Sequence, residues 1–322
     1  MNISRREYIK ACIALTVAAS ARSVFANEPL LAPTAETAKV VGNFAYIYGQ
    51  PQLRDQFVDF YTNVFHLYPE QEMHKLVNRL TLAYHTDDEI YQQLQAALPE
   101  IEPFLSSLRY ALPALAKQKA EMTRQTVELL DQGRRYNGYM EIGTTGRYLS
   151  QLEDQLQISD ERYLLHTTEA GYGPQDIIER GQLSQIGSFV DMGDYSTEFT
   201  KLIAPKSLDL VTVYIGFHHC PLHKREDYIA SVIELIRPGG KLILRDHDAH
   251  NEDMRRVAAL AHDTFNAGTQ QSLESNKNEL RHFYSHEFII DTLQRAGLRH
   301  DGKILFQPGD PTRNGLMAFT RV

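Results

Sequence analysis

Cysteine is scarce in this sequence of 322 residues, which contains Cys12 and Cys220 and no other. Cys12 lies within a segment that resembles a removable leader, so we expect no disulfide within the mature chain. A run of about 18 apolar residues is also missing, which excludes an evident membrane-spanning helix. Basic residues are not in excess, because the formal charge is −8. We therefore expect no nucleic-acid partner and favour a small-molecule substrate.

The first 26 residues are typical of a targeting segment. Residues 4–10 (SRREYIK), with the pair Arg5 and Arg6, resemble the twin-arginine export signal. A short apolar run at 11–21 follows, and residues 24–26 end in the small side chain that a signal peptidase requires. The resemblance implies a protein exported to the periplasm without an integral membrane segment. Two alternatives remain open, namely a cytoplasmic protein with an inefficient signal and an amphipathic N-terminal helix.

The rest of the chain divides into a linker at 27–37, a helical domain at 38–134 and a second domain at 135–322. Aromatic and aliphatic residues in the helical part recur at the three- and four-residue steps of one helix face. These are Phe57, Phe60, Tyr61, Val64 and Phe65. Further helices are expected at 74–84, 88–98, 103–115 and 117–130. This domain is expected to serve as a lid or as the interface of a homodimer.

After Gly133 short aliphatic runs alternate with helical stretches, which predicts a parallel sheet covered on both faces. The expected strands are 139–142, 163–168, 188–190, 208–215 and 241–244, and the expected crossover helices are 175–180 and 227–236. The last two runs, 303–306 and 316–320, have no room for a helix between them and must pair antiparallel. The predicted fold is α/β, a Rossmann-like, doubly wound, mostly parallel seven-stranded sheet with an antiparallel C-terminal hairpin and an all-helical N-terminal domain.

A glycine turn follows the first expected strand in residues 139–147 (YMEIGTTGR). Gly143 and Gly146 permit a tight turn and the close approach of a ligand to the backbone. A dinucleotide fingerprint would need glycine where Thr145 and Tyr148 stand, which argues against a nicotinamide oxidoreductase. By itself the turn is equally consistent with a purely structural role.

Two later segments add to this turn. Residues 207–219 (SLDLVTVYIGFHH) and 234–246 (ELIRPGGKLILRD) follow at suitable distances. Together the three segments resemble the class I S-adenosylmethionine-dependent methyltransferases over residues 135–322. The resemblance implies S-adenosylmethionine as cofactor and direct methyl transfer to a small-molecule acceptor. The alternative is an exported, non-catalytic or repurposed binding protein of this fold, since S-adenosylmethionine is made in the cytoplasm.

The resemblance also implies a set of cofactor-binding residues. The set is Glu141, Gly143, Thr145, Gly146, Glu169, Asp194 and Tyr195. The first four would surround the methionine part, and Glu169 would accept hydrogen bonds from both ribose hydroxyls. Asp194 would take the adenine amino group with Tyr195 beside the ring, and Asp191 is its rival. The turn departs from the family's pattern at Thr145 and Arg147, where glycines are usual.

Polar side chains gather after the fourth and fifth expected strands, where parallel strands open onto a common crevice. They are His218, His219, Cys220, His223, Asp246, His247, Asp248 and His250. Three interpretations stay open: His219 or His247 acts as a general base, the cluster holds a metal, or it lines the pocket. For the metal, His218, His223, Asp246 and His250 are the candidates. Their spacing fits no defined site, so we assign no metal.

The segment beyond the fifth strand is expected to cover the acceptor. Arg281 and Tyr284 in this segment are the candidates for acceptor binding, although a surface helix would account for them nearly as well.

Overall fold

The computed structural model describes residues 42–103, 112–131, 133–173, 182 and 184–322. The expected leader and linker, the expected helix at 175–180 and most of the one at 103–115 lie outside these ranges. Within them, no helix combines the length and the apolar character of a membrane span.

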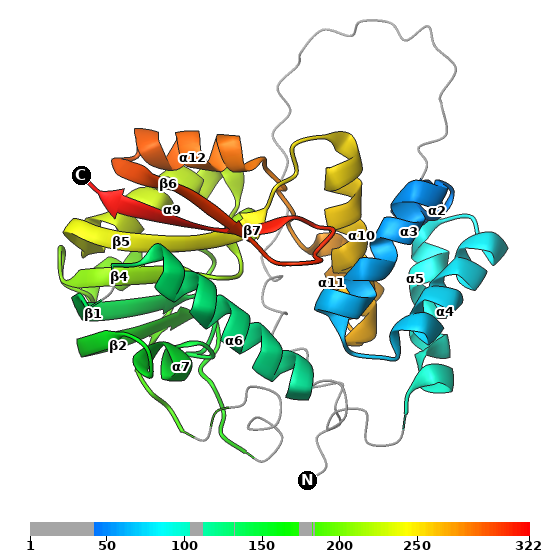
Figure 1. The fold of residues 1–322 in the computed structure, drawn as a ribbon, viewed down its shortest axis with the longest axis horizontal. Helices are drawn as coiled ribbons and strands as arrows, with labels where there is room; N and C mark the ends of the chain where they lie inside the picture. The colour runs from blue at the N-terminus through cyan, green and yellow to red at the C-terminus, as the bar shows by residue number, and fades with distance from the viewer. Residues whose placement is uncertain (1–41, 104–111, 132, 174–181, 183) are drawn as a thin grey trace, which may run out of the picture.

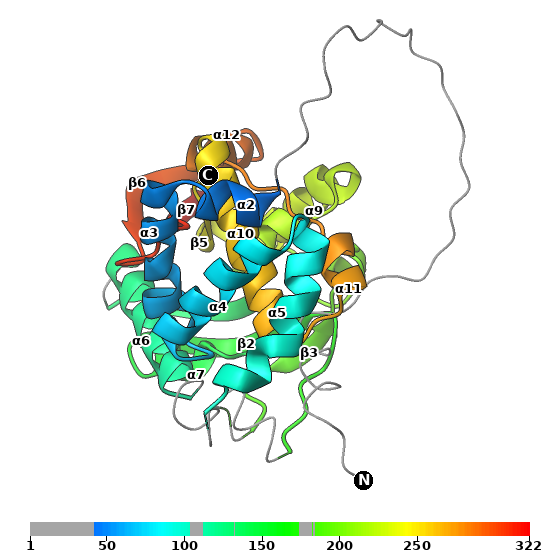
Figure 2. The same ribbon diagram turned by 90° about the vertical axis from the view of Figure 1, so that its right-hand side faces the viewer.

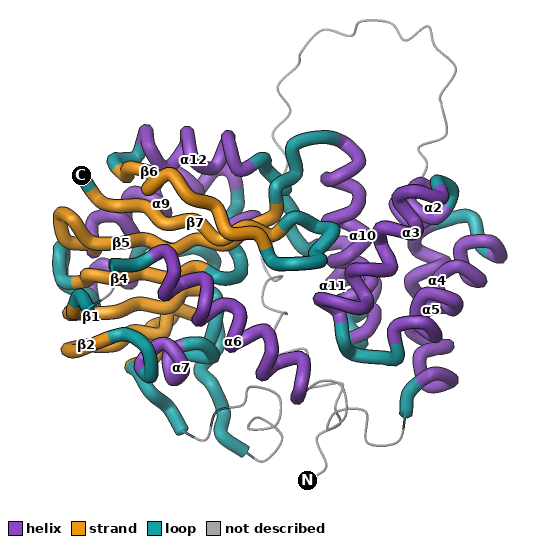
Figure 3. Tube along the Cα trace, viewed as in Figure 1, coloured by secondary structure: helices purple, strands orange, loops and turns teal. Residues whose placement is uncertain are grey.

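Seven strands form one sheet that occupies one side of the molecule (Figures 1 and 3). They are β1 (Arg135–Ile142), β2 (Gln157–His166), β3 (Ser188–Asp191), β4 (Leu208–Val213), β5 (Ile236–His247), β6 (Leu298–Phe306) and β7 (Asn314–Arg321). Their order is β3-β2-β1-β4-β5-β7-β6, with β1 to β5 parallel and β7 antiparallel to both neighbours. This is the sheet of the class I methyltransferase fold, so the predicted fold class is confirmed.

Helices cover both faces of the sheet. Because alternate side chains of each strand point to opposite sides, each strand contributes to two apolar cores. On β4, Val211 packs into one core and Leu210 into the other. The first core is covered by α9 (Leu222–Leu235) and α12 (His286–Arg295). The second is covered by α6 (Leu112–Leu129) and α7 (Leu149–Glu153). The helix α6 thus packs on the sheet, although its residues lie within the expected helical domain at 38–134.

A separate helical layer lies beside the carboxyl edge of the sheet (Figure 2). Its first part comprises α2 (Asn43–Tyr48), α3 (Pro51–Phe60), the π-helical turn η1 (Tyr61–Phe65), α4 (Glu70–Ala83) and α5 (Asp87–Ile101). Its second part, α10 (Glu252–Gly268) and α11 (Leu273–Asn278), comes from the chain after β5. Phe57 and Tyr61 share one apolar core with Val257 and Leu260 of α10. The helical layer is therefore built from two segments far apart in the sequence.

The bounds of the helix α10 follow from its local sequence. Asn251 caps its first turn by accepting a hydrogen bond from the Met254 amide at 2.8 Å, and Glu252 and Asp253 place negative charge at the positive end of the helix dipole. At the other end, a Cβ on Gly268 would lie 2.6 Å from the Phe65 ring. Glycine at this position lets α10 pack closely against η1.

The strand β5 begins five residues earlier than the expected start at 241. Leu208 of β4 pairs with Ile236, but Leu210 pairs with Lys241, so residues 237–240 bulge out opposite Asp209. Arg237 and Asp209 form an ion pair across the bulge at 3.1 Å. The segment RPGG therefore forms a bulge inside the strand.

Candidate functional site

The turn after β1 brings the carboxyl ends of β1 and β4 into direct contact. Gly143 has a φ of +79°, and a Cβ built on it would lie 2.3 Å from the carbonyl oxygen of Ile215. A side chain there would need both a left-handed backbone and displacement of the β4 chain. Glycine is thus required at this position by two independent constraints.

A small apolar pocket, part of it open to solvent, adjoins this turn. Gly143, Tyr195, Gly216, Phe217 and Cys220 line its side nearest the carboxyl ends of the strands. The Tyr195 hydroxyl donates a hydrogen bond to the Gly216 carbonyl at 2.8 Å, which joins the segment after β3 to the segment after β4. Of the seven residues expected to bind the cofactor, the lining contains Gly143 and Tyr195.

Glu141 is buried inside the turn. Its carboxylate accepts hydrogen bonds from the hydroxyl groups of Tyr139, at 3.0 Å, and Thr144. Burial raises the pKa of the Glu141 carboxyl, while these hydrogen bonds and the charge of Arg147 oppose the rise. The carboxylate therefore holds the turn from within.

The other expected cofactor residues have different surroundings. Gln182 donates a hydrogen bond to the Gly146 carbonyl at 2.6 Å and a longer one, at 3.4 Å, to that of Thr145. Glu169 is exposed three residues beyond the end of β2. Asp194 is exposed too, and its carboxylate lies 2.5 Å from Nζ of Lys224. The expected ligands for the ribose and the adenine are thus directed at solvent and at a lysine in this structure.

The two residues expected to bind the acceptor also have protein partners. Arg281 forms ion pairs at 2.7 Å with both Asp263 and Glu279, and 13% of its side chain is exposed. The Tyr284 hydroxyl accepts a hydrogen bond at 2.7 Å from Arg225, which lines the pocket. Arg281 thus ties α10 to the segment after α11, whereas Tyr284 contacts the wall of the pocket.

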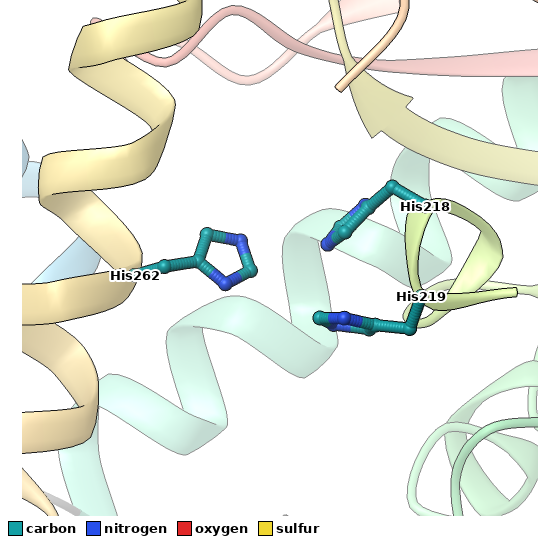
Figure 4. A group of neighbouring side chains, drawn as sticks. All are labelled: His218, His219 and His262. Atoms are coloured by element: carbon teal, nitrogen blue, oxygen red, sulfur yellow. The ribbon is translucent and has the colours of Figure 1, made fainter. Parts of the chain in front are cut away.

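Four histidines meet between the sheet and the helical layer. His218 and His219 lie on the one-turn 3-10 helix η4 (Phe217–His219), His247 ends β5, and His262 comes from α10. The ring of His262 lies 5.0, 5.6 and 5.5 Å from those of His218, His219 and His247. Figure 4 shows the rings of His218, His219 and His262 pointing toward one another.

The sequence placed three of these histidines in one crevice and missed His262. Its position on a helix gave no local signal, because the contact depends on α10 packing beside the sheet edge. His223 and His250, which adjoin the cluster in sequence, are exposed. Among the described residues, they do not belong to the group of histidines whose ring nitrogens converge.

Burial governs the protonation of this cluster. It lowers the pKa of both His219 and His247 to about 4, with the neighbouring His218 adding to the effect. Burial by itself would raise the pKa of Asp246, but the contact with His218 lowers it below its usual value. At neutral pH His219 and His247 are therefore neutral, and the Asp246 carboxylate is ionised.

No protein-family model and no curated protein matches this sequence. Among solved structures, the carbon methyltransferase CurJ is 13% identical to this chain. The alignment covers 84% of this chain and 70% of CurJ, with a TM-score of 0.46. The mitomycin 7-O-methyltransferase MmcR is 14% identical, covering 78% and 68%, with a TM-score of 0.44.

A third structure is the Burkholderia thailandensis 1,6-didemethyltoxoflavin-N1-methyltransferase, which holds 1,6-didemethyltoxoflavin and S-adenosylhomocysteine. It is 12% identical, covering 65% of this chain and 79% of its own, with a TM-score of 0.42. These likenesses are distant and concern the fold, and they add no argument about activity.

Proposed function

We propose that this protein is an S-adenosylmethionine-dependent methyltransferase that transfers a methyl group directly to a small-molecule acceptor. The supporting observation is the left-handed turn at Gly143, which opens onto the pocket at the carboxyl ends of β1 and β4. Open α/β sheets bind ligands at this edge. Gly143 also lets the ends of β1 and β4 meet at the rim of this pocket, because a Cβ on it would lie 2.3 Å from the Ile215 carbonyl oxygen.

The proposed binding residues divide by their parts of the cofactor. The backbone of Gly143, Thr145 and Gly146 faces the methionine part, and Tyr195 lies beside the adenine. Asp194 binds the adenine amino group after exchanging its present partner, Lys224, for it. Glu141 contributes from inside the turn through Thr144, and Glu169, being exposed, is free to reach the ribose hydroxyls.

The cofactor supplies an activated methyl group, so the protein has mainly to align the acceptor. As the acceptor atom bonded to the methyl carbon, the bond from that carbon to sulfur would break and release S-adenosylhomocysteine, and the acceptor hydroxyl or amine would lose its proton. His219 and His247 are the candidate acceptors of that proton, because their lowered pKa leaves them neutral at pH 7. Tyr284 reaches the acceptor side through Arg225.

A second candidate function is an exported binding protein that has this fold and no turnover. The observation that favours it is the ion pair between Lys224 and Asp194, the residue expected to bind the adenine amino group. The neighbouring pocket is lined mostly by apolar side chains. Such a protein would bind an apolar ligand instead of the cofactor.

Calorimetric titration with S-adenosylhomocysteine separates the two functions. The methyltransferase is expected to bind it with micromolar affinity, and Asp194→Ala is expected to weaken binding about tenfold, since a hydrogen bond to a charged group contributes about 1.5 kcal/mol or more. Glu198→Ala is the matched control, because Glu198 is an exposed acid paired with Lys201 on the next helical turn. Absence of binding by the wild-type protein would favour the second function.

A further inference from the structure

We propose that His218, His219 and His262 bind a divalent transition-metal ion, with zinc as the best fit and the Glu279 carboxylate as a fourth ligand, which leaves His247 as the candidate acceptor of the substrate proton. Among the described residues, these three histidines form the group whose ligand atoms all lie within 4.8 Å of one another. Imidazole nitrogen and carboxylate oxygen are ligands that zinc prefers in tetrahedral sites. Ligand nitrogens of such a site stand about 3.4 Å apart, so the rings need a small inward rotation.

The hydrogen bonds of two histidines fix which ring nitrogen is bare. The Nδ1 atom of His219 lies 2.6 Å from the carbonyl oxygen of Leu280, so Nδ1 carries the proton and donates it. Nδ1 of His218 does the same toward the ionised Asp246 at 2.7 Å. With the proton on Nδ1, Nε2 is the ring nitrogen that each of these histidines can offer to a metal. Nε2 of the buried His218 has no hydrogen-bond partner among the described residues.

The third histidine adds a conflict that a cation resolves. Nδ1 of His247 donates to the Thr312 carbonyl at 3.2 Å, which leaves its Nε2 bare at 3.3 Å from Nε2 of His262. If His262 carries its proton on Nε2, its bare Nδ1 faces the Glu279 carboxylate at 3.9 Å. If it carries the proton on Nδ1, two bare Nε2 atoms face each other. With a single ring proton, His262 always points one lone pair at another electron-rich atom, either Nε2 of His247 or the Glu279 carboxylate. A metal ion bound to His262 removes this repulsion.

His219 repeats this conflict. Its bare Nε2 atom lies 3.7 Å from the Glu279 carboxylate, so a lone pair faces an anion. Arg281 holds the same carboxylate at 2.7 Å. A cation between Nε2 and the carboxylate turns the repulsion into two coordinate bonds.

The buried charges around the histidines also require a cation. Asp246, Asp263 and Glu279 contribute three negative charges, and Arg281 contributes one positive charge that Asp263 and Glu279 share. The acidic side chains thus outnumber the arginine in a largely buried cluster, an arrangement that is costly unless it is compensated. A divalent cation provides that compensation.

The surroundings resemble the outer shell that metal sites usually have. A metal-binding histidine normally donates its other ring proton to a carboxylate or a carbonyl, which orients the ring. Asp246 does this for His218, and the Leu280 carbonyl does it for His219. The His282 amide also donates to the His218 carbonyl at 2.8 Å, which secures the turn.

The test is metal binding by the full-length protein, freed of any affinity tag and stripped with a chelator. Titration with Zn²⁺ at pH 7.5 is expected to give one tight site per chain, and Co²⁺ is expected to give the visible absorption of a tetrahedral site. His262→Gln is expected to weaken Zn²⁺ binding more than about 100-fold, and Asp246→Asn roughly tenfold. His223→Gln, an exposed histidine on α9, is the matched control and should bind like the wild type.

Wild-type protein that takes up no stoichiometric Zn²⁺ or Co²⁺, or His262→Gln that binds as tightly as wild type, would overturn the proposal. Circular dichroism shows whether His262→Gln folds. If it does not, X-ray absorption of the wild-type Zn²⁺ complex decides, because the proposal requires three imidazole ligands. Titration of the stripped protein with S-adenosylhomocysteine reports on the proposed cofactor site independently.

Discussion

The ammonium group of Lys224 lies 2.5 Å from the Asp194 carboxylate and 2.7 Å from its backbone carbonyl. The first turn of α9 is thereby tied to the loop after β3. This contact competes directly with the proposed role of Asp194 in binding the adenine amino group.

Replacement of the lysine tests this competition. Lys224→Met is expected to free Asp194 and to strengthen S-adenosylhomocysteine binding about two- to fivefold, because an exposed ion pair contributes about 1 kcal/mol or less. The same change in the Asp194→Ala background is expected to have no effect. Calorimetry of the four proteins measures the coupling, and equal effects in both backgrounds would show that Lys224 does not act through Asp194.

The glycine turn allows a matched pair of substitutions. Gly143 and Gly239 have φ values of +79° and +77°, but a Cβ meets the Ile215 carbonyl at 2.3 Å in the first and nothing within 4 Å in the second. Gly239→Ala is expected to lower the free energy of unfolding by about 1 kcal/mol, the conformational part alone. Gly143→Ala is expected to lower it by about 3 kcal/mol and to abolish cofactor binding. Urea unfolding measures both, and equal losses would contradict the close contact of β1 and β4.

Arg281 is expected to act chiefly in stability. Arg281→Met leaves the buried Asp263 and Glu279 without their shared cation, and we expect a loss of about 3 kcal/mol. Arg255→Met, on an exposed arginine of α10 paired with Glu252, is expected to cost less than about 0.5 kcal/mol. Urea unfolding in the presence of a chelator compares them. If Arg281→Met unfolds like the wild type, Arg281 becomes an acceptor-binding candidate again.

Glu141 gives a pH dependence of known sign. Burial raises its pKa in the folded protein above that of the unfolded chain, so the folded state binds more protons between the two values and stability falls as pH rises through that window. Glu141→Gln lacks this loss, so the variant is expected to gain stability relative to wild type from about pH 4.5 upward, by about 1.4 kcal/mol for each pH unit between the two pKa values. The charge of Arg147 opposes the rise in the Glu141 pKa. Burial lowers the pKa of Lys119, and the charge of Glu141 opposes that fall. Unfolding midpoints of both proteins between pH 4 and 8 test this, and a constant difference would refute it.

Substitution of the paired arginines in the expected leader tests the proposed export. Wild-type protein is expected in the periplasmic fraction, and Arg5→Lys with Arg6→Lys is expected to keep the protein in the cytoplasm because the translocase recognises that pair. Cell fractionation with an immunological readout shows the distribution. Equal distribution of the two proteins would mean that the segment is not a twin-arginine signal.

The strands of this fold follow from local patterns. The runs around Val211 and Leu242 are mostly apolar because both faces of the sheet are covered. The link between Phe306 and Asn314 is too short for a helix, which made antiparallel pairing of β6 and β7 predictable. By contrast, the early start of β5 at Ile236 depends on a bulge opposite Asp209, and a bulge depends on the partner strand.

Sequence alone determined the succession of strands along the chain, the glycine turn at the end of β1, and the meeting of His218 and His219 with His247. These features depend on neighbouring residues or on the rule that parallel strands open at one edge. Tertiary structure decided that His262 joins them, that Lys224 holds Asp194, and that Arg281 lies in an internal ion-pair network. The physical reason is that each of these contacts joins segments separated by at least 15 residues, and their approach is set by packing of α9 and α10 rather than by any local preference.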